Sequence, residues 1–192
     1  MRKLFIISAA AIVLMLALIT GCTERSNPFL PYIVPTPAAN CDNAESIGTK
    51  MGDIQYYKVT RDLVWVSRHQ ANNSGTVTSI SIKSADGGDV KVGLYSSSNV
   101  LMAQSEIVRI DKGWNLIAIP AAQIYSGVTY GIAVKVFGDM NLFSIAEGDS
   151  SMFAAPLLEI FPSTGDALPD PLGTRQEYRT TTLFIYADYC PF

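Results

Sequence analysis

Residues 128–137, Val-Thr-Tyr-Gly-Ile-Ala-Val-Lys-Val-Phe, alternate between two kinds of side chain. One side carries Val128, Tyr130, Ile132, Val134 and Val136, and the other carries Thr129, Gly131, Ala133, Lys135 and Phe137. A period of two residues is typical of a β-strand, because successive side chains point to opposite faces of a sheet. The segment therefore predicts a long strand with one face in a core. The hydroxyl of Tyr130 lies on the apolar side, so it needs a buried hydrogen-bond partner.

Shorter alternating segments occur on both sides of this strand, separated by turns rich in Gly, Asn, Asp and Ser. The expected strands cover residues 54–60, 63–68, 76–83, 90–95, 100–104, 106–111, 114–120, 141–147 and 180–188. Within 76–83, the alternation places Val77 and Ile80 on opposite faces. Recurrent short strands with such turns are typical of an antiparallel sandwich or barrel. We therefore expect an all-β fold, a single jelly-roll-like antiparallel β-sandwich of about nine strands, over residues 41–192.

The two tryptophans and two of the glycines have a structural interpretation. Trp65 lies between two valines in an expected strand, and we place it in the core. Trp114 directly follows a glycine turn, where its large ring can cap the core. Gly93 and Gly131 lie opposite apolar neighbours in their strands, so they can allow close packing.

Composition excludes several classes of protein. The chain has 192 residues, 48% of them apolar and 16% charged, which excludes an intrinsically disordered protein. Its formal charge of −3 leaves no broad basic surface for nucleic acid. Three cysteines and one histidine exclude most zinc sites, iron–sulfur clusters and multi-disulfide scaffolds.

Residues 1–21 begin with a basic pair at positions 2–3 and continue as an apolar run over 4–19, interrupted only by Ser8. This order is typical of a secretory signal. The run ends in Leu18-Ile19-Thr20-Gly21-Cys22, which resembles the lipobox of bacterial lipoproteins. The resemblance implies that residues 1–21 are a signal peptide and that Cys22 carries lipid. A retained membrane helix and ordinary secretion are the alternatives, and all three place the domain outside the cytoplasm.

Residues 22–40 have the composition of a tether. They contain the prolines at positions 28, 31, 35 and 37, and proline fixes φ and lacks an N–H, so we expect an extended, semi-rigid spacer. Without the signal peptide, 12 basic and 17 acidic residues remain, a net charge of −5. An acidic domain is not attracted to anionic lipid. We therefore expect the lipid on Cys22 to be the membrane anchor, on the extracytoplasmic face of the cell envelope.

If Cys22 is lipidated, Cys41 and Cys190 remain, and they bracket the expected domain. Outside the cytoplasm two remaining thiols favour a disulfide. We expect a Cys41–Cys190 bond, with two unpaired cysteines as the alternative.

Residues 63–137 also resemble a second group of proteins. The segments concerned are Ser74 to Ile80, Val90 to Tyr95, Leu101 to Ser105, Gly113 to Asn115, Ile119-Pro120 and Ser126 to Ala133. Their order looks like that of jelly-roll modules attached to bacterial and archaeal surface proteins, some of which accompany carbohydrate-active or adhesion domains. The resemblance implies a β-sandwich at the cell surface. It implies no set of ligand-binding residues, since one sandwich carries many functions.

Residues with catalytic or metal-binding chemistry are few. His69 is the one histidine, and a lone histidine at a strand end is more often solvated than catalytic. Glu147 and Asp149 are weak candidates for a structural Ca²⁺ site or for glycoside hydrolysis, and the turn residues Asp86 and Asp89 flank a pair of glycines in a similar way. Acidic residues in turns are usually turn formers. We therefore expect no cofactor and no enzyme activity.

Residues 161–179 are rich in proline and glycine and predict a long irregular loop. Five aromatic residues near loops or strand ends could stack on sugar rings, although strand propensity also explains each of them: Tyr56, Tyr57, Tyr125, Phe161 and Tyr178. We expect a non-catalytic binding or adhesion module for a glycan or an envelope protein, with Arg175, Tyr178 and Arg179 as candidate ligand-binding residues. A purely structural envelope subunit and, less favoured, a glycan-active hydrolase are the alternatives.

Overall fold

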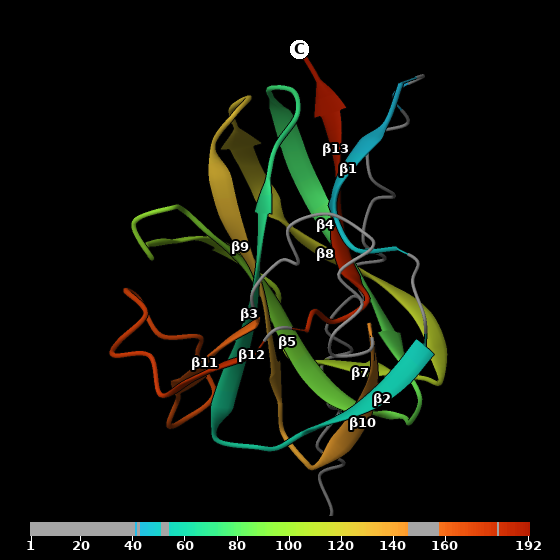
Figure 1. The fold of residues 1–192 in the computed structure, drawn as a ribbon. Helices are drawn as coiled ribbons and strands as arrows, with labels where there is room; N and C mark the ends of the chain where they lie inside the picture. Colours follow the sequence, from blue (N-terminus) through green and yellow to red (C-terminus); the bar gives the residue numbers. More distant parts are fainter. Residues whose placement is uncertain (1–40, 42, 51–53, 146–157, 180) are drawn as a thin grey trace, which may run out of the picture. The chain divides into compact units, whose positions relative to one another are not determined.

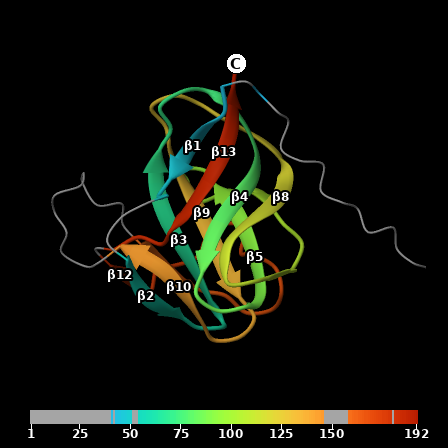
Figure 2. The same ribbon diagram turned by 90° about the vertical axis from the view of Figure 1, so that its right-hand side faces the viewer.

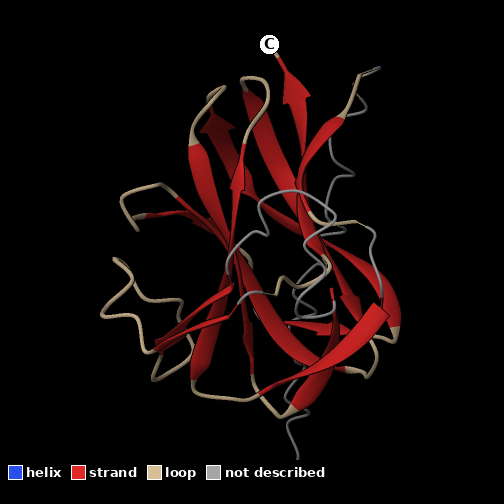
Figure 3. Cartoon of the chain, viewed as in Figure 1, coloured by secondary structure: helices blue, strands red, loops and turns tan. Residues whose placement is uncertain are grey.

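Thirteen β-strands and no helix make up the part of the chain that the computed structural model describes, residues 41–192 without 42, 51–53, 146–157 and 180 (Figure 3). Within these residues no helix could span a membrane. One antiparallel sheet contains β1 (Glu45–Gly48), β2 (Ile54–Val59), β4 (Gly75–Ser84), β8 (Gly113–Ile124), β10 (Met140–Ile145) and β13 (Ile185–Pro191). The other contains β3 (Leu63–Gln70), β5 (Gly88–Tyr95), β6 (Leu101–Gln104), β7 (Val108–Ile110), β9 (Thr129–Val136), β11 (Leu158–Pro162) and β12 (Glu177–Arg179).

The strand pairs are nested along the chain. Strand β5 pairs with β6 and β7, β4 with β8, β3 with β9, β2 with β10, and β1 with β13 (Figure 1). The chain is thus one long hairpin that is rolled up, because β13 also pairs with β4 and β9 also pairs with β5. This arrangement is that of a jelly roll, in which long antiparallel pairs curl into two facing sheets. The expected fold class is confirmed.

The main core lies between the two sheets (Figure 2). It is formed by the inward side chains of both, among them Ile80 and Ile82 of β4 and Ile132 and Val134 of β9. Tyr130 belongs to this core, and its hydroxyl accepts a hydrogen bond from the backbone N–H of Tyr125 at 2.8 Å. The alternation read from residues 128–137 therefore describes the central strand correctly.

A second apolar cluster covers the outer face of the seven-stranded sheet. The irregular residues 163–172, here called the strap, place Leu168 and Leu172 against this face. The Tyr95 hydroxyl donates to the carbonyl of Pro169 at 2.7 Å, and the N–H of Leu172 donates to the carbonyl of Asn99 at 3.0 Å. The segment is irregular, as expected, but its described residues are held firmly by packing and hydrogen bonds.

Strands β1, β11 and β12 were not expected from the sequence, so the number of strands exceeds nine. All three are short, and β1 and β12 each pair along one edge only. The edge strands β1 and β12 have four and three residues, too few for a visible alternation, and β11, with five residues, lies between β12 and β3. The last strand also begins later than expected, at Ile185, whereas β8 continues past Pro120 to Ile124.

A bulge corrects the prediction for residues 76–83. The pairing of β4 with β13 shifts between Val77, opposite Tyr189, and Ser79, opposite Asp188, which leaves Thr78 as the extra residue. An extra residue reverses the inward and outward sides beyond it. Val77 therefore shares the main core with Ile80 and Ile82 rather than facing away from them.

The expected disulfide is confirmed. Cys41 and Cys190 are bonded, with their Cα atoms 5.8 Å apart, within the usual range for a disulfide. Cys190 lies in β13 and Cys41 precedes β1, so the bond joins the two ends of the domain beside their paired strands.

Candidate ligand-binding face

The outer face of the six-stranded sheet carries large apolar side chains. Strand β4 alternates so that Ile80 and Ile82 point into the core while Ser81 and Lys83 point outward. In the register of the sheet, Trp114 of β8 lies opposite Lys83, and Leu116 of β8 lies opposite Ser81. Trp114 is 42% exposed and Leu116 is 59% exposed. Single exposed apolar side chains are common, but a cluster on one face marks an interaction site.

Four aromatic rings cross this face as a continuous series, here called the aromatic row: Tyr186, Trp114, Phe143 and Tyr56. The rings of Tyr186 and Trp114 are 5.1 Å apart, and so are those of Phe143 and Tyr56. The ammonium of Lys83 joins the two pairs, because it lies 5.8 Å from the Trp114 ring and 4.7 Å from the Phe143 ring. The rings thus come from β13, β8, β10 and β2, and Lys83 comes from β4, which pairs with β13, β8 and β10.

One end of the row carries an ion pair. The ammonium of Lys50 lies 4.3 Å from the centre of the Tyr186 ring and 3.6 Å from the carboxylate of Asp188. At the other end Tyr56 is 65% exposed. Lys83 forms no ion pair with a described carboxylate, and its ammonium also lies 5.6 Å from the centre of the Phe184 ring.

The expectation that Trp114 caps the core is wrong. Its ring packs edge-on against Tyr186 on the outside of the sheet, because Trp114 pairs with Lys83 and therefore shares the outward face of that residue. Trp65 is in the core, as expected, with its ring 5.2 Å from that of Tyr57. Its Nε1 has no hydrogen-bond partner in the described part of the chain.

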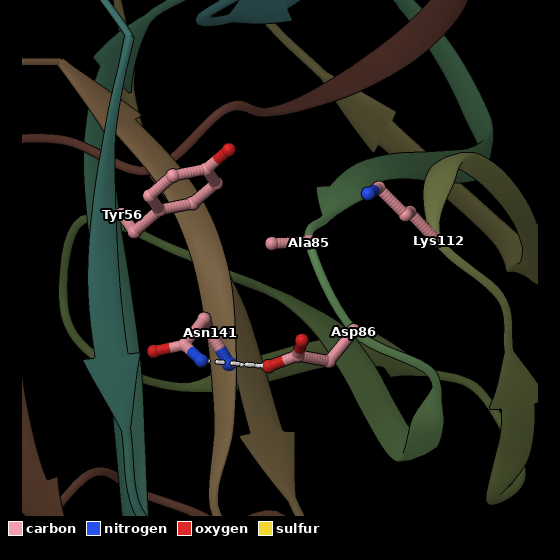
Figure 4. A pocket seen from close by; sticks show the side chains of 5 residues that line it. All are labelled: Tyr56, Ala85, Asp86, Lys112 and Asn141. Carbon is pink, nitrogen blue, oxygen red and sulfur yellow. Dashed lines mark hydrogen bonds between the residues drawn. The ribbon is translucent and has the colours of Figure 1, made fainter.

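A hollow of about 340 Å³ adjoins Tyr56 (Figure 4). Its other lining residues are Ala85, Asp86, Lys112 and Asn141. One carboxylate oxygen of Asp86, Oδ2, accepts hydrogen bonds from both the backbone N–H and the side-chain Nδ2 of Asn141, each at 2.8 Å. Figure 4 shows the Tyr56 hydroxyl and the Lys112 ammonium on opposite sides of the opening, with the Asp86–Asn141 pair along one edge.

The candidates Tyr178 and Arg179 lie in β12 of the seven-stranded sheet, Arg175 lies just before this strand, and none of the three belongs to the aromatic row. Arg175 donates to one oxygen of Glu159 at 2.9 Å, and Arg68 donates to the other at 2.8 Å. Arg179 forms an ion pair with Glu177. The backbone of Tyr178 pairs with that of Glu159, and its side chain is outside the described part. The role of Arg175, Tyr178 and Arg179 in ligand binding stays a prediction.

The acidic candidates are only partly described. Glu147 and Asp149 lie outside the described residues. Asp86 lines the hollow, and Asp89 forms an ion pair with Arg109 at 3.3 Å. Within the described ranges no three His, Cys, Asp or Glu side chains are grouped as metal ligands would be. The possible Ca²⁺ site stays a prediction.

His69 is largely buried rather than solvated. Burial lowers its pKa to about 4, because the desolvated imidazolium loses its hydration. Its Nε2 has no hydrogen-bond partner among the described residues. The imidazole is thus neutral at pH 7. Among the described residues, no hydroxyl or carboxylate is hydrogen-bonded to its Nε2, where the imidazole could activate it.

The aromatic row could be predicted only in part. Tyr56 was among the aromatic candidates. Phe161, another candidate, is buried in the apolar cluster between the strap and the seven-stranded sheet. Lys83, Leu116 and Phe143 were missed. One signal was present: residues 114–120 are apolar at both odd and even positions, which indicates a strand with apolar side chains on both of its faces.

No protein-family model and no curated protein matches this chain in sequence.

Proposed function

We propose that the protein is a non-catalytic cell-envelope lipoprotein whose β-sandwich is a binding or adhesion module for a glycan. The observation that supports this most is the aromatic row on the outer face of the six-stranded sheet. A sugar ring presents a face of C–H groups, which packs against the negatively polarised face of an aromatic ring. Trp114 and Tyr56 are the well-exposed rings, whereas Phe143 is buried and braces Tyr56. Two exposed rings on different strands of one face suit an extended chain of sugars better than a single small molecule.

The sheet provides the rigidity that such a site needs. Each ring of the row projects from a paired strand rather than from a free loop, so little conformational entropy is lost on binding. The lipid on Cys22 and the tether would hold this face at a distance from the membrane. Both the anchor and the ligand class belong to the proposal.

The binding test uses the full chain in detergent micelles on an array of envelope glycans. Trp114→Ala should weaken glycan binding about tenfold, the loss typical of a central aromatic contact. Tyr125→Ala is the matched control, because this tyrosine is 53% exposed but lies away from the row after β8. Equal losses in the two variants would contradict the proposed face.

Other outcomes separate the competing functions. Capture of one envelope protein, with no glycan signal and no effect of Trp114→Ala, would favour a structural subunit. Hydrolysis of an envelope polymer that is lost in Glu147→Gln would overturn the non-catalytic assignment.

The anchor has a separate test. Metabolic labelling with a fatty-acid probe should label the wild-type protein and not Cys22→Ala. Equal labelling of both proteins would end the lipoprotein assignment while leaving the binding face untouched.

A further inference from the structure

The hollow beside Tyr56 is preformed, because hydrogen bonds hold its lining residues Ala85, Asp86 and Asn141 in place. The carboxylate of Asp86 is fixed by the two N–H groups of Asn141, and the hydroxyl of Ser84 donates to the Asp86 carbonyl at 2.6 Å. The N–H of Ala85 donates to the Asn141 carbonyl at 2.9 Å. The turn after β4 and the strand β10 are thus tied together, and the orientation of the Asn141 amide follows, because its Nδ2 must face the carboxylate.

Four polar groups of the hollow remain unused by the described residues: Asp86 Oδ1, Asn141 Oδ1, the Tyr56 hydroxyl and the Lys112 ammonium. None of them has a hydrogen bond or an ion pair within the described part of the chain. Two are acceptors only, one is a donor only, and the hydroxyl is both. Vicinal sugar hydroxyls, which donate and accept at neighbouring positions, match this set.

The charges in the hollow cancel. Lys112 contributes one positive charge and Asp86 one negative charge, so an anionic group would meet both an attraction and a repulsion at close range. The ring of Tyr56 belongs to both the hollow and the aromatic row, and it is braced by Phe143 at 5.1 Å. An apolar wall with hydrogen-bonding groups beside it is the usual form of a small-ligand subsite.

We infer that this hollow is a subsite for one uncharged pyranose ring, at the end of the glycan that the aromatic row carries. The sugar stacks on Tyr56, gives hydroxyl protons to Asp86 and Asn141, and accepts a hydrogen bond from Lys112. This inference rests on the proposed function, and it adds the class of sugar and the residues that recognise it.

The experiment compares oligosaccharides of glucose, N-acetylglucosamine and galacturonic acid of equal length, titrated into the full chain in detergent micelles. At least one neutral oligosaccharide should bind more tightly than the galacturonic acid oligosaccharide. Lys112→Met should weaken the neutral ligand about fivefold, the effect of one net hydrogen bond. Asp86→Asn should weaken it similarly, because the amide oxygen would stay with the donors of Asn141 and an NH2 group, which cannot accept a hydrogen bond, would face the sugar.

Arg61→Met is the matched control, since it removes the same charge from an exposed turn between β2 and β3. Lys112 is exposed and has no described partner, so its variant should fold normally, and a thermal melt checks this. Tighter binding of the galacturonic acid oligosaccharide would overturn the inference. Neutral sugar binding that Trp114→Ala weakens but Lys112→Met and Asp86→Asn leave unchanged would overturn the subsite and retain the proposed function. Absence of binding by all three sugars would end the glycan assignment and the subsite together.

Discussion

At the scale of single residues, two polar side chains of the seven-stranded sheet, those of His69 and Lys135, are largely buried. His69 of β3 lies opposite Tyr130 of β9 in the register of the seven-stranded sheet, and Lys135 of β9 is almost fully buried. The Lys135 ammonium donates to the hydroxyl and the carbonyl of Ser163, at 2.7 and 3.1 Å. Lys135 therefore has partners in the strap, whereas the Nε2 of His69 has none among the described residues.

His69 predicts a loss of stability in mild acid. Its pKa is about 4 in the folded protein and 6.5 in the unfolded chain, so between these values the unfolded chain binds the proton and the folded protein does not. The free energy of unfolding should then fall as the pH decreases from about 6.5 towards 4, by up to about 3 kcal/mol. Urea unfolding of wild type and His69→Gln across this range measures the difference. Parallel pH profiles of the two proteins would refute the assignment.

Gly131 predicts a steric effect. A Cβ atom at this position would lie 2.7 Å from Val66 Cγ1 and 2.9 Å from Arg68 Nη1. Gly131→Ala should therefore destabilise the fold by about 1–3 kcal/mol, as overpacking does. Gly138→Ala is the control, because no heavy atom lies within 4 Å of its added Cβ. Chemical denaturation that gives the same midpoint for both variants would contradict this close packing.

At the scale of elements, the strap replaces a layer of secondary structure. The outer face of β3, β5 and β9 is apolar at Val64, Val66, Tyr95 and Ala133, and an exposed face of this kind would favour aggregation. The strap covers it without forming a strand of its own. Its anchoring depends on apolar contacts and on a few hydrogen bonds to the sheet.

Leu168 is the side chain that should test the strap most directly. It is 3% exposed and packs over Gly93, which has no side chain to exclude it. Leu168→Ala should cost about 3 kcal/mol, and it should speed amide exchange at Leu172 in the same segment. Thr164→Ala, an exposed change in the strap, serves as the control. Unchanged exchange at Leu172 in Leu168→Ala would show that the strap is held by other contacts.

At the scale of the whole molecule, the nested hairpin pairs residues that are far apart in the chain. Strands β1 and β13 are the outermost pair, and the Cys41–Cys190 bond joins residues separated by 149 positions beside them. Closing a loop of this length in the unfolded chain removes much of its conformational entropy. A disulfide at this position therefore stabilises the pairing of β1 with β13, which otherwise has the largest loop-closure entropy cost of the nested pairs.

Replacing both cysteines, Cys41→Ser with Cys190→Ser, should lower the free energy of unfolding by about 2–5 kcal/mol. Denaturation with and without reductant measures the effect: reductant should destabilise the wild type and leave the double variant unchanged. Cys22→Ser is the control, because it removes the one cysteine that is outside the bond and leaves the bond intact. A reductant effect of equal size in the double variant would contradict the structural role of this bond.

The sequence by itself determined the fold class, the central strand at 128–137, most other strands and the disulfide partners, because each depends on local alternation or on a small set of cysteines. Only the tertiary structure decided the aromatic row, the exposure of Trp114 and the burial of His69. Alternation shows which residues share a face of one strand, but not which strands are neighbours or how they are aligned. Trp114, Lys83 and Phe143 meet because β8, β4 and β10 pair in one register, and long-range pairing sets that register.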